Sequence, residues 1–281
     1  MKNWNRMACL AWLCLAVAAR AAVVTVMDTG FESGETPSYQ AGEQLHVAGG
    51  LPYTWNWAGD NVGVISANPA AVYSGAQGLD ATRTSYVGSQ LWWTRPGIAF
   101  PNMDSGTVEI EFAVRTTGWL DSQDSFLEIA TSDIGINDFG ANSTRFSWLT
   151  LKGNQRLYAL DGSSEVELAS GLSITDWNTV RLTINLMSSA YDVYWNDTLL
   201  GDGLAFYGSG LGSLNSLQFK EYNSGQSSGG VYLDDLNIQW SPVPEPGTLT
   251  LLVVAFLLLA ASRRRMLVTT HETTLHPSAG G

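Results

Sequence analysis

The stretch WNTVRLTINLMSSAYDVYWNDTLL, residues 177–200, carries the pattern that decides the fold. Apolar residues occupy every second position over 180–186 and again over 191–195, which is the period of a β-strand with one buried face. The pair Asn196-Asp197 then tolerates positive φ and is typical of a two-residue type I′ turn. The stretch therefore predicts one strand followed by a β-hairpin.

The same alternation recurs on both sides of this stretch. Over 107–115 apolar residues alternate with Glu109 and Glu111, and over 231–240 the apolar face switches at Asp234-Asp235, which indicates a β-bulge. About a dozen short strands without helical periodicity predict an antiparallel sandwich or barrel. The further strand candidates are 23–27, 62–66, 90–94, 126–130, 145–151, 156–160 and 216–222.

Four segments together resemble a concanavalin A/laminin-G-like jelly roll. They are Asp28–Gly34, Val72–Leu79, Trp177–Leu182 with its hairpin, and Val231–Ile238. The resemblance implies an all-β, antiparallel jelly-roll β-sandwich over 22–242, with the first and last strands as neighbours. In this superfamily the concave sheet often binds glycans and some members hydrolyse them, although a fold by itself does not define a function.

The first 21 residues indicate a signal peptide. A charged start is followed by the apolar residues 7–19 and by the small-x-small cleavage site Ala19-Arg20-Ala21, which is the order of a secretory signal. Both cysteines, Cys9 and Cys14, lie inside this segment. We therefore expect an exported chain that contains no thiol and no disulfide after processing.

The C-terminal segment indicates a second targeting signal. Pro244-Glu245-Pro246 is followed by the apolar stretch 249–261 and by Arg263-Arg264-Arg265. As a helix this stretch would be about 20 Å long, which is short for a ~30 Å hydrocarbon core, and the arginines would stay on the cytoplasmic side. The order resembles a PEP-CTERM sorting signal over 243–265, which implies processing by an exosortase. A Pro-rich linker before an ordinary membrane anchor is the alternative.

Residues 266–281 extend beyond the PEP-CTERM pattern and are expected to form a short cytoplasmic tail. The expected partners are the secretion machinery, the exosortase, the membrane before processing, and an extracellular polysaccharide. We expect the protein to be anchored transiently in the inner membrane and then released to the cell envelope or the extracellular space.

The segment between the two signals is strongly acidic. Six of the 14 basic residues and two of the 26 acidic residues lie outside 22–242, so this segment holds 24 acids and 8 bases, a net charge near −16. Such a surface repels phosphate backbones. Nucleic acid is therefore excluded as a partner, while the charge by itself identifies no ligand.

An enzymatic function is tested by the acids on the strand at 107–115. Laminarinase-type members of the superfamily carry a third acid where this chain has Val114, beside a pair corresponding to Glu109 and Glu111. Retaining glycosidases need two carboxyl groups about 5–5.5 Å apart. The simpler interpretation makes both glutamates solvated charges opposite basic neighbours. His46 is the one histidine within 22–242, so the sequence predicts no catalytic site.

Tryptophan gives the strongest indication of ligand binding, because nine of the eleven tryptophans lie within 22–242. Aromatic rings beside polar groups can stack on sugars. The candidates for glycan stacking are Trp55, Trp57, Trp92, Trp93 and Trp119. Trp148, Trp177, Trp195 and Trp240 are assigned to packing.

No cofactor is expected, and calcium is a weaker hypothesis. Asp121 and Asp124 crowd a predicted loop, and Asp234 and Asp235 mark the predicted bulge. Calcium needs 6–8 converging oxygens, but no EF-hand-like spacing is present, so the simpler interpretation is solvated loop acids.

Two functions remain open. The first is an exported, non-catalytic protein that serves the envelope or extracellular matrix as a structural or glycan-adhering component. The second is a secreted glycan hydrolase or lyase of the laminarinase-like superfamily with a divergent site.

Overall fold

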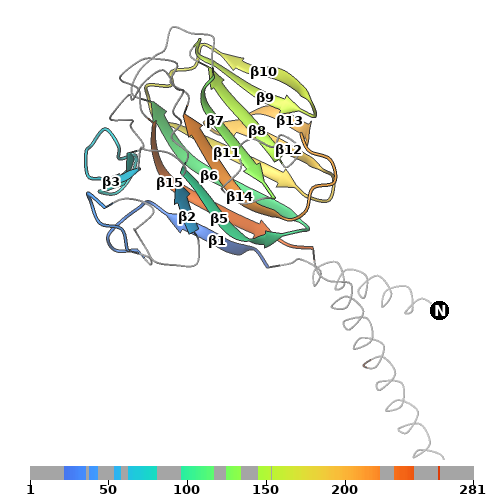
Figure 1. The fold of residues 1–281 in the computed structure, drawn as a ribbon, viewed down its shortest axis with the longest axis horizontal. Coiled ribbons are helices and arrows are strands. Elements are labelled where there is room, and N and C mark those ends of the chain that lie inside the picture. Colours follow the sequence, from blue (N-terminus) through green and yellow to red (C-terminus); the bar gives the residue numbers. More distant parts are fainter. Residues whose placement is uncertain are drawn as a thin grey trace, which may run out of the picture. The chain divides into compact units, whose positions relative to one another are not determined.

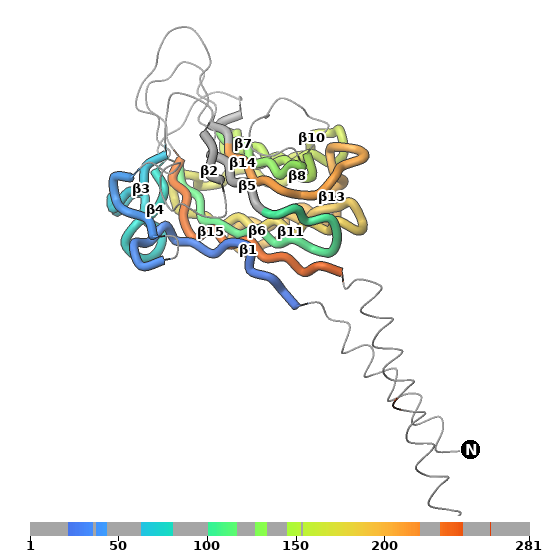
Figure 2. Tube along the Cα trace, turned by 60° about the horizontal axis from the view of Figure 1, so that its bottom comes forward, coloured from blue at the N-terminus to red at the C-terminus, as the bar shows by residue number. Residues whose placement is uncertain are grey.

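The chain forms two antiparallel β-sheets that face each other (Figures 1 and 2), as seen in a computed structural model. The structure describes residues 22–35, 38–43, 54–57, 63–80, 96–116, 125–133, 145–152, 154–221, 231–243 and 259. All of the described strands lie in one compact unit, Val23–Pro242. The other unit joins Met1–Ala22 and Val243–Gly281, of which only Ala22, Val243 and Leu259 are described.

The first sheet has eight strands. Its path runs β13 (Thr198–Ala205), β12 (Ala190–Trp195), β11 (Asn178–Asn185), β6 (Thr107–Thr116), β15 (Val231–Ser241), β4 (Gly78–Asp80) and β3 (Val64–Ser66). The eighth strand, β1 (Val24–Thr29), pairs with β15. The first and last strands are therefore neighbours, as the resemblance to a jelly roll implied.

The second sheet has seven strands. Its order is β10 (Ser164–Ser170), β9 (Arg156–Asp161), β8 (Arg145–Lys152), β7 (Ser125–Ser132), β14 (Leu214–Glu221), β5 (Pro96–Met103) and β2 (Thr54–Trp57). Along the chain, β5, β6 and β7 alternate between the two sheets, as do β13, β14 and β15. Such crossing connections are typical of a jelly roll and confirm the predicted all-β sandwich.

The stretch at 177–200 folds as predicted. β11 pairs with β12, and β12 pairs with β13 across the Asn196-Asp197 turn. Both turn residues have positive φ, 48° and 61°, as a type I′ turn requires. The predicted bulge is also present, because the pairing of β15 with β6 shifts between Asp234 and Asn237 and Asp235 has a φ of 47°.

Four strands were not predicted from the sequence: β2, β4, β5 and β10. β4 has only three residues, too few to show a period. β5 begins with Pro96 and contains Pro101, and proline counts against an interior strand because it cannot donate to the ladder. The candidate strand at 90–94 lies outside the described residues.

Apolar side chains from both sheets fill the space between them. Phe112 of β6 meets Phe219 of β14 edge to face, with ring centroids 5.1 Å apart, a geometry that adds about 0.5–1.5 kcal/mol to burial. Tyr191 of β12 also spans the core, since its hydroxyl donates a hydrogen bond to the Leu160 carbonyl of β9. Burial raises the pKa of this phenol, so it remains a donor. The two sheets are thus joined by apolar contact and by a polar contact.

Among the described residues, no helix is long and apolar enough to cross a membrane. The apolar stretch 249–261, the sorting motif and the cytoplasmic tail lie outside the described residues apart from Leu259, which is helical.

Candidate functional site

The outward side of the seven-stranded sheet carries an unusual set of polar side chains. On β14, Leu217 and Phe219 belong to the core, so Ser216 and Gln218 point to the opposite side, because successive side chains of a strand alternate. The same alternation and pairing apply on β7 and β8. We call this surface the polar face; its members are Glu128, Ser132, Arg145, Trp148, Thr150, Ser216 and Gln218.

Most of the polar face is shielded from water although it points away from the hydrophobic core. Ser216 is 0% exposed, Gln218 and Ser132 are 3% exposed, and Glu128 is 5% exposed. Burying a polar group costs free energy unless it forms a hydrogen bond. The polar face must therefore be satisfied internally or by a bound molecule.

Hydrogen bonds join the β7 and β14 side of the polar face into a network. The hydroxyl oxygens of Ser132 and Ser216 are 2.7 Å apart, and the Ser216 hydroxyl also lies 3.3 Å from the Ser132 carbonyl. The Gln218 side-chain amide donates to the Ser132 hydroxyl at 3.4 Å. Two strands are thus linked by side chains as well as by their backbones, which holds these groups in fixed positions.

An aromatic group lies beside this network on β8. The Arg145 guanidinium stacks 3.7 Å from the centre of the Trp148 ring, a favourable cation–π geometry. Tyr207, which follows β13, meets the same indole edge to face at 6.0 Å. The Trp148 indole N–H is buried and has no hydrogen-bond acceptor among the described residues. An unsatisfied buried donor costs about 1–3 kcal/mol.

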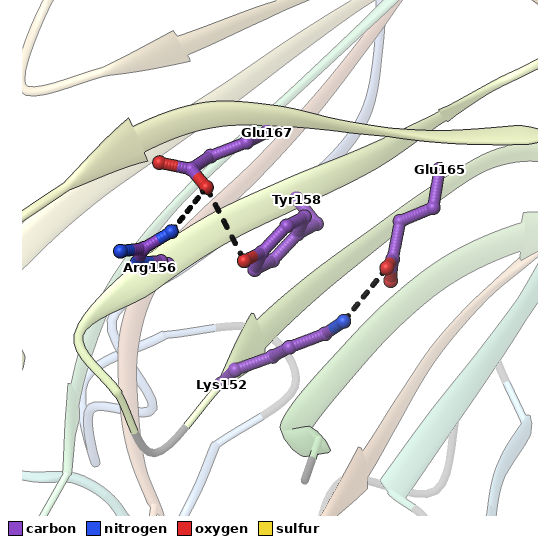
Figure 3. Close-up of polar contacts among 5 residues, drawn as sticks. All are labelled: Lys152, Arg156, Tyr158, Glu165 and Glu167. Atoms are coloured by element: carbon purple, nitrogen blue, oxygen red, sulfur yellow. Dashed lines mark hydrogen bonds and ion pairs between the residues drawn. The ribbon is translucent and has the colours of Figure 1, made fainter. Parts of the chain in front are cut away.

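A ladder of charged residues continues the outward surface over β8, β9 and β10 (Figure 3). Lys152 pairs with Glu165 at 2.7 Å, and Arg156 pairs with Glu167 at 2.7 Å. Tyr158 lies between the two pairs: its hydroxyl donates to Glu167 at 3.3 Å and the Lys152 ammonium is 4.0 Å from its ring centre. We call these five residues the charged ladder. Its positive and negative groups are matched one to one.

The outward side of the eight-stranded sheet is different. Glu109 and Glu111 of β6 flank Arg181 of β11, at 3.8 Å and 4.0 Å, and their side chains are 43% and 44% exposed. Arg181 also stacks 3.7 Å from the ring centre of Tyr194. Partial burial raises the pKa of Glu111, and Arg181 opposes this shift. The interpretation of both glutamates as solvated charges opposite a basic neighbour is confirmed.

Val114 does not extend this acidic pair. It is 2% exposed and belongs to the core, while Glu109 and Glu111 point outward. Because side chains alternate along a strand, position 114 does not share a face with the two glutamates. A third acid at this position would lie between the sheets.

Asp234 and Asp235 anchor a loop. Asp234 accepts hydrogen bonds from the backbone N–H groups of Tyr73, Ser74 and Asp235, at 2.8, 3.1 and 2.9 Å. Burial raises the pKa of Asp234 to about 6, against the opposing effect of these three hydrogen bonds. Asp235 accepts a hydrogen bond from the Ser74 hydroxyl at 2.7 Å. The two aspartates therefore tie the segment before β4 to the bulge of β15.

Glu32 supports the same segment, accepting from the N–H groups of Ala76 and Gln77 at 2.6 and 2.9 Å. The described residues contain no group of three or more histidine, cysteine, aspartate or glutamate side chains placed to hold a metal ion. The oxygens proposed from the sequence as calcium ligands at Asp234 and Asp235 thus contact protein donors here.

The structure describes only two of the other predicted site residues. Trp55 and Trp57 lie on β2, the edge strand of the seven-stranded sheet. The positions outside the described residues are Trp92, Trp93, Trp119, Asp121, Asp124, Pro244, Glu245, Pro246, Arg263, Arg264 and Arg265.

Sequence reasoning missed the polar face. Trp148 was assigned to packing, and it does pack against Arg145 and Tyr207, but it alternates with the core residue Leu149 and so lies on the outward side of the sheet. Trp195 is buried in the core as expected. The signal that could have revealed the face was the serine and glutamine at alternate positions of the candidate strand at 216–222.

The fold and the two outward faces define an antiparallel β-sandwich of two sheets. The chain is similar to a carbohydrate esterase from the Shiga toxin-encoding bacteriophage phi24B, with a TM-score of 0.51, 12% identity, and coverage of 78% of this chain and 100% of that one. The binding domain of botulinum neurotoxin serotype D gives 0.49 and 13%, with 78% and 48% covered. A sialidase gives 0.45 and 11%, with 65% and 18% covered.

At these identities the likenesses show the fold alone. The chain spans about half of the neurotoxin domain and less than a fifth of the sialidase. No family model and no curated protein sequence matches the chain.

Proposed function

We propose that the protein is exported, acts without catalysis in the cell envelope or extracellular matrix, and binds polysaccharide through the polar face of its β-sandwich. The observation that carries the binding function is that Trp148 and Tyr158 lie on the outward side of the seven-stranded sheet, next to the charged ladder and the hydrogen-bonded network of β7 and β14. Sugar sites combine a few fixed polar groups with aromatic surface. On the eight-stranded sheet, the outward Glu109 and Glu111 are instead 43% and 44% exposed beside Arg181.

Export and sorting rest on the two terminal patterns. The signal peptide at 1–21 would be removed, and the segment 249–261 would anchor the chain until an exosortase processes it near Pro244-Glu245-Pro246. Intact-mass spectrometry of protein taken from the envelope of a host with a matching exosortase tests this. The mature chain should start near Ala22 and end near Pro246, whereas retention of 249–265 would leave a plain membrane anchor.

The absence of catalysis rests on the placement of the acids. Glu109 and Glu111 point outward beside Arg181, and Val114 occupies the core. These positions do not support the three-acid strand of laminarinase-type enzymes. The likeness to a carbohydrate esterase, at 12% identity, transfers no activity to this chain.

One observation favours the alternative of a divergent glycan hydrolase or lyase. Glu128 lies on the polar face and is 5% exposed, as a shielded catalytic acid would be. A retaining or inverting hydrolase also needs a second carboxyl group within about 5–9.5 Å. Among the described members of the polar face, Glu128 is the one acid, so binding is the better-supported function.

The binding function is tested by affinity electrophoresis of the purified protein against a panel of bacterial and algal polysaccharides, with reducing-sugar release measured in parallel. We expect retardation in at least one gel without release of sugar. Release that disappears in a Glu128→Gln variant would establish the hydrolase instead. If no polysaccharide retards the protein, the polar face has only a structural role.

A further inference from the structure

Two aromatic side chains meet at one end of the eight-stranded sheet, on loops that are far apart in the sequence. Tyr73 lies in loop 67–77, before β4, and Trp177 lies in loop 171–177, before β11. Their ring centroids are 5.5 Å apart and the rings are inclined by 56°. Tyr73 is 45% exposed and Trp177 is half-buried. We call this pair the aromatic platform; unlike the shielded members of the polar face, it is accessible to a molecule in solution.

Arg115 of β6 holds both loops on the outward side of the sheet. Its position alternates with the buried positions of the strand, so its side chain points away from the core. The Arg115 Nε donates to the Thr175 carbonyl of the Trp177 loop at 2.7 Å, and its Nη1 donates to the Ala70 carbonyl of the Tyr73 loop at 3.2 Å. One side chain thus fixes the two loops side by side.

Further hydrogen bonds restrain each loop without involving the rings. Asp234 of β15 accepts from the Tyr73 backbone N–H at 2.8 Å. In the loop that carries Trp177, the Ile174 carbonyl accepts from the Thr116 backbone N–H and from the Thr116 hydroxyl, each at 2.9 Å. Rings that are positioned in advance lose little conformational freedom when a ligand binds. The platform is therefore preorganised for contact with a ligand.

The size of the platform suits a small ligand better than a protein partner. One aromatic side chain offers about 150–250 Å² of contact surface at most, whereas a stable protein interface takes about 800 Å² from each partner. A single ring face can be covered by one sugar ring, whose C–H groups pack on the aromatic surface. The platform therefore fits one sugar unit.

Carboxylates flank both rings. The exposed Asp176 precedes Trp177, and Asp235 accepts a hydrogen bond from the hydroxyl of Ser74, next to Tyr73, at 2.7 Å. Like charges repel, so these groups disfavour a uronate or a sulfated sugar. Carboxylate oxygens accept hydrogen bonds from sugar hydroxyls and attract the ammonium group of an amino sugar. The ligand class that fits is a neutral or amino sugar.

We propose that the aromatic platform is a second sugar-binding site, at which one neutral or amino sugar of an extracellular polysaccharide stacks on the Tyr73 ring. Trp177 supports this ring from the side, and the flanking carboxylates accept hydrogen bonds from the sugar. The platform lies on the outward side of the eight-stranded sheet and the polar face on that of the seven-stranded sheet, so the two sites are on opposite sides of the sandwich. The inference rests on the proposed function for the class of ligand but not for the site.

The test is affinity electrophoresis of the full chain in mild detergent. The gels contain neutral polymers (glucan, mannan and galactan), chitosan as an amino-sugar polymer, or alginate as an acidic polymer. We expect retardation by a neutral polymer or by chitosan. Tyr73→Leu, which keeps an apolar side chain and removes the ring, should weaken binding about three- to tenfold, while Tyr73→Phe should retain it. Both variants should fold, because the hydrogen bond to Asp234 comes from the backbone.

Met187→Ala is the matched control and should leave binding unchanged. Met187 is 67% exposed and follows the end of β11 that pairs with Thr107, away from Arg115. Tyr158→Leu reports on the surface of the seven-stranded sheet.

The outcomes separate this inference from the proposed function. If Tyr158→Leu lowers binding and Tyr73→Leu does not, at equal melting temperatures, the platform is not a site and the proposed function stands. A loss in Tyr73→Leu alone supports the platform and overturns the assignment of binding to the polar face. Selective retardation by alginate overturns the ligand class inferred for the platform. Should no polymer retard the protein, the inference and the binding function fail together.

Discussion

The outward faces of the two sheets are both polar, but they differ in their access to water. On the eight-stranded sheet, Glu109 and Glu111 are nearly half exposed and share Arg181. On the seven-stranded sheet, Ser216 and Gln218 are almost fully shielded. An exposed polar side chain can be substituted at little cost in stability, because water satisfies its hydrogen bonds. A shielded one must be satisfied by defined partners within the structure. The difference identifies the second face as the one whose chemistry is constrained.

The largest effect on stability is expected for a core residue on the inward side of β14. We expect Phe219→Ala to lower the free energy of unfolding by about 3–5 kcal/mol, because it leaves a cavity opposite Phe112. Urea denaturation of the two proteins measures the difference. A loss below about 1 kcal/mol would show that the two sheets do not pack through this ring pair.

The polar face should show the next largest effect. Ser216→Ala removes the hydroxyl 2.7 Å from that of Ser132 and should cost about 1–3 kcal/mol, since it leaves a buried group short of a partner. Thr183→Val, on the half-exposed face of β11, keeps the β-branched shape and should cost less than about 0.5 kcal/mol. Equal losses in the two variants, measured by denaturant titration, would remove the contrast between the faces.

Asp234, a buried acid of the eight-stranded sheet, should make the stability of the protein depend on pH. The pKa of Asp234 is about 6 in the folded protein against 3.8 ordinarily, so the folded state holds this proton more tightly than the unfolded chain does. Its contribution to stability is present below pH 3.8 and is lost as pH rises through about 6. When the pH is lowered from 7 to 5, the free energy of unfolding should rise by about 1 kcal/mol.

The measurement for Asp234 is the melting temperature of the protein over this pH range, compared with that of Asp234→Asn. The gain on acidification should be smaller in the variant. An identical pH profile in both proteins would mean that Asp234 does not carry the effect.

The smallest effect is expected on the solvated face. Replacing Glu109 and Glu111 together with glutamine should change stability by less than about 1 kcal/mol, because exposed ion pairs at 3.8–4.0 Å contribute little. Polysaccharide binding should be unchanged as well. If the double variant lost binding, the ligand would have to be placed on the eight-stranded sheet.

Much of the fold could be predicted from the sequence where one face of a strand is apolar. β6, β11 and the hairpin of β12 and β13 follow this rule, and the bulge at Asp234-Asp235 appeared as a change of period. β10 was missed because its exposed pattern has little apolar contrast, although Gly162-Ser163 before it is a two-residue turn with positive φ at the glycine. That turn was the available signal.

The candidate site could not be predicted in the same way. The alternation of side chains shows which side of a strand a residue occupies, but not whether that side is accessible to water. Asp234 shows the same limit: its sequence context suggested an oxygen ligand for calcium, while its actual donors come from Tyr73 and Ser74, 161 and 160 residues away.

The sequence by itself determined the class of fold, the hairpin, the bulge and the outward direction of Glu109 and Glu111, because each depends on local period and turn chemistry. The export and sorting signals are also local patterns, and they stay predictions. Only the tertiary structure decided that Ser132 and Ser216, 84 residues apart in the chain, share a hydrogen bond, and that Trp148 faces outward beneath Arg145. The physical reason is that burial and partner choice depend on strand pairing between distant segments, which no local pattern encodes.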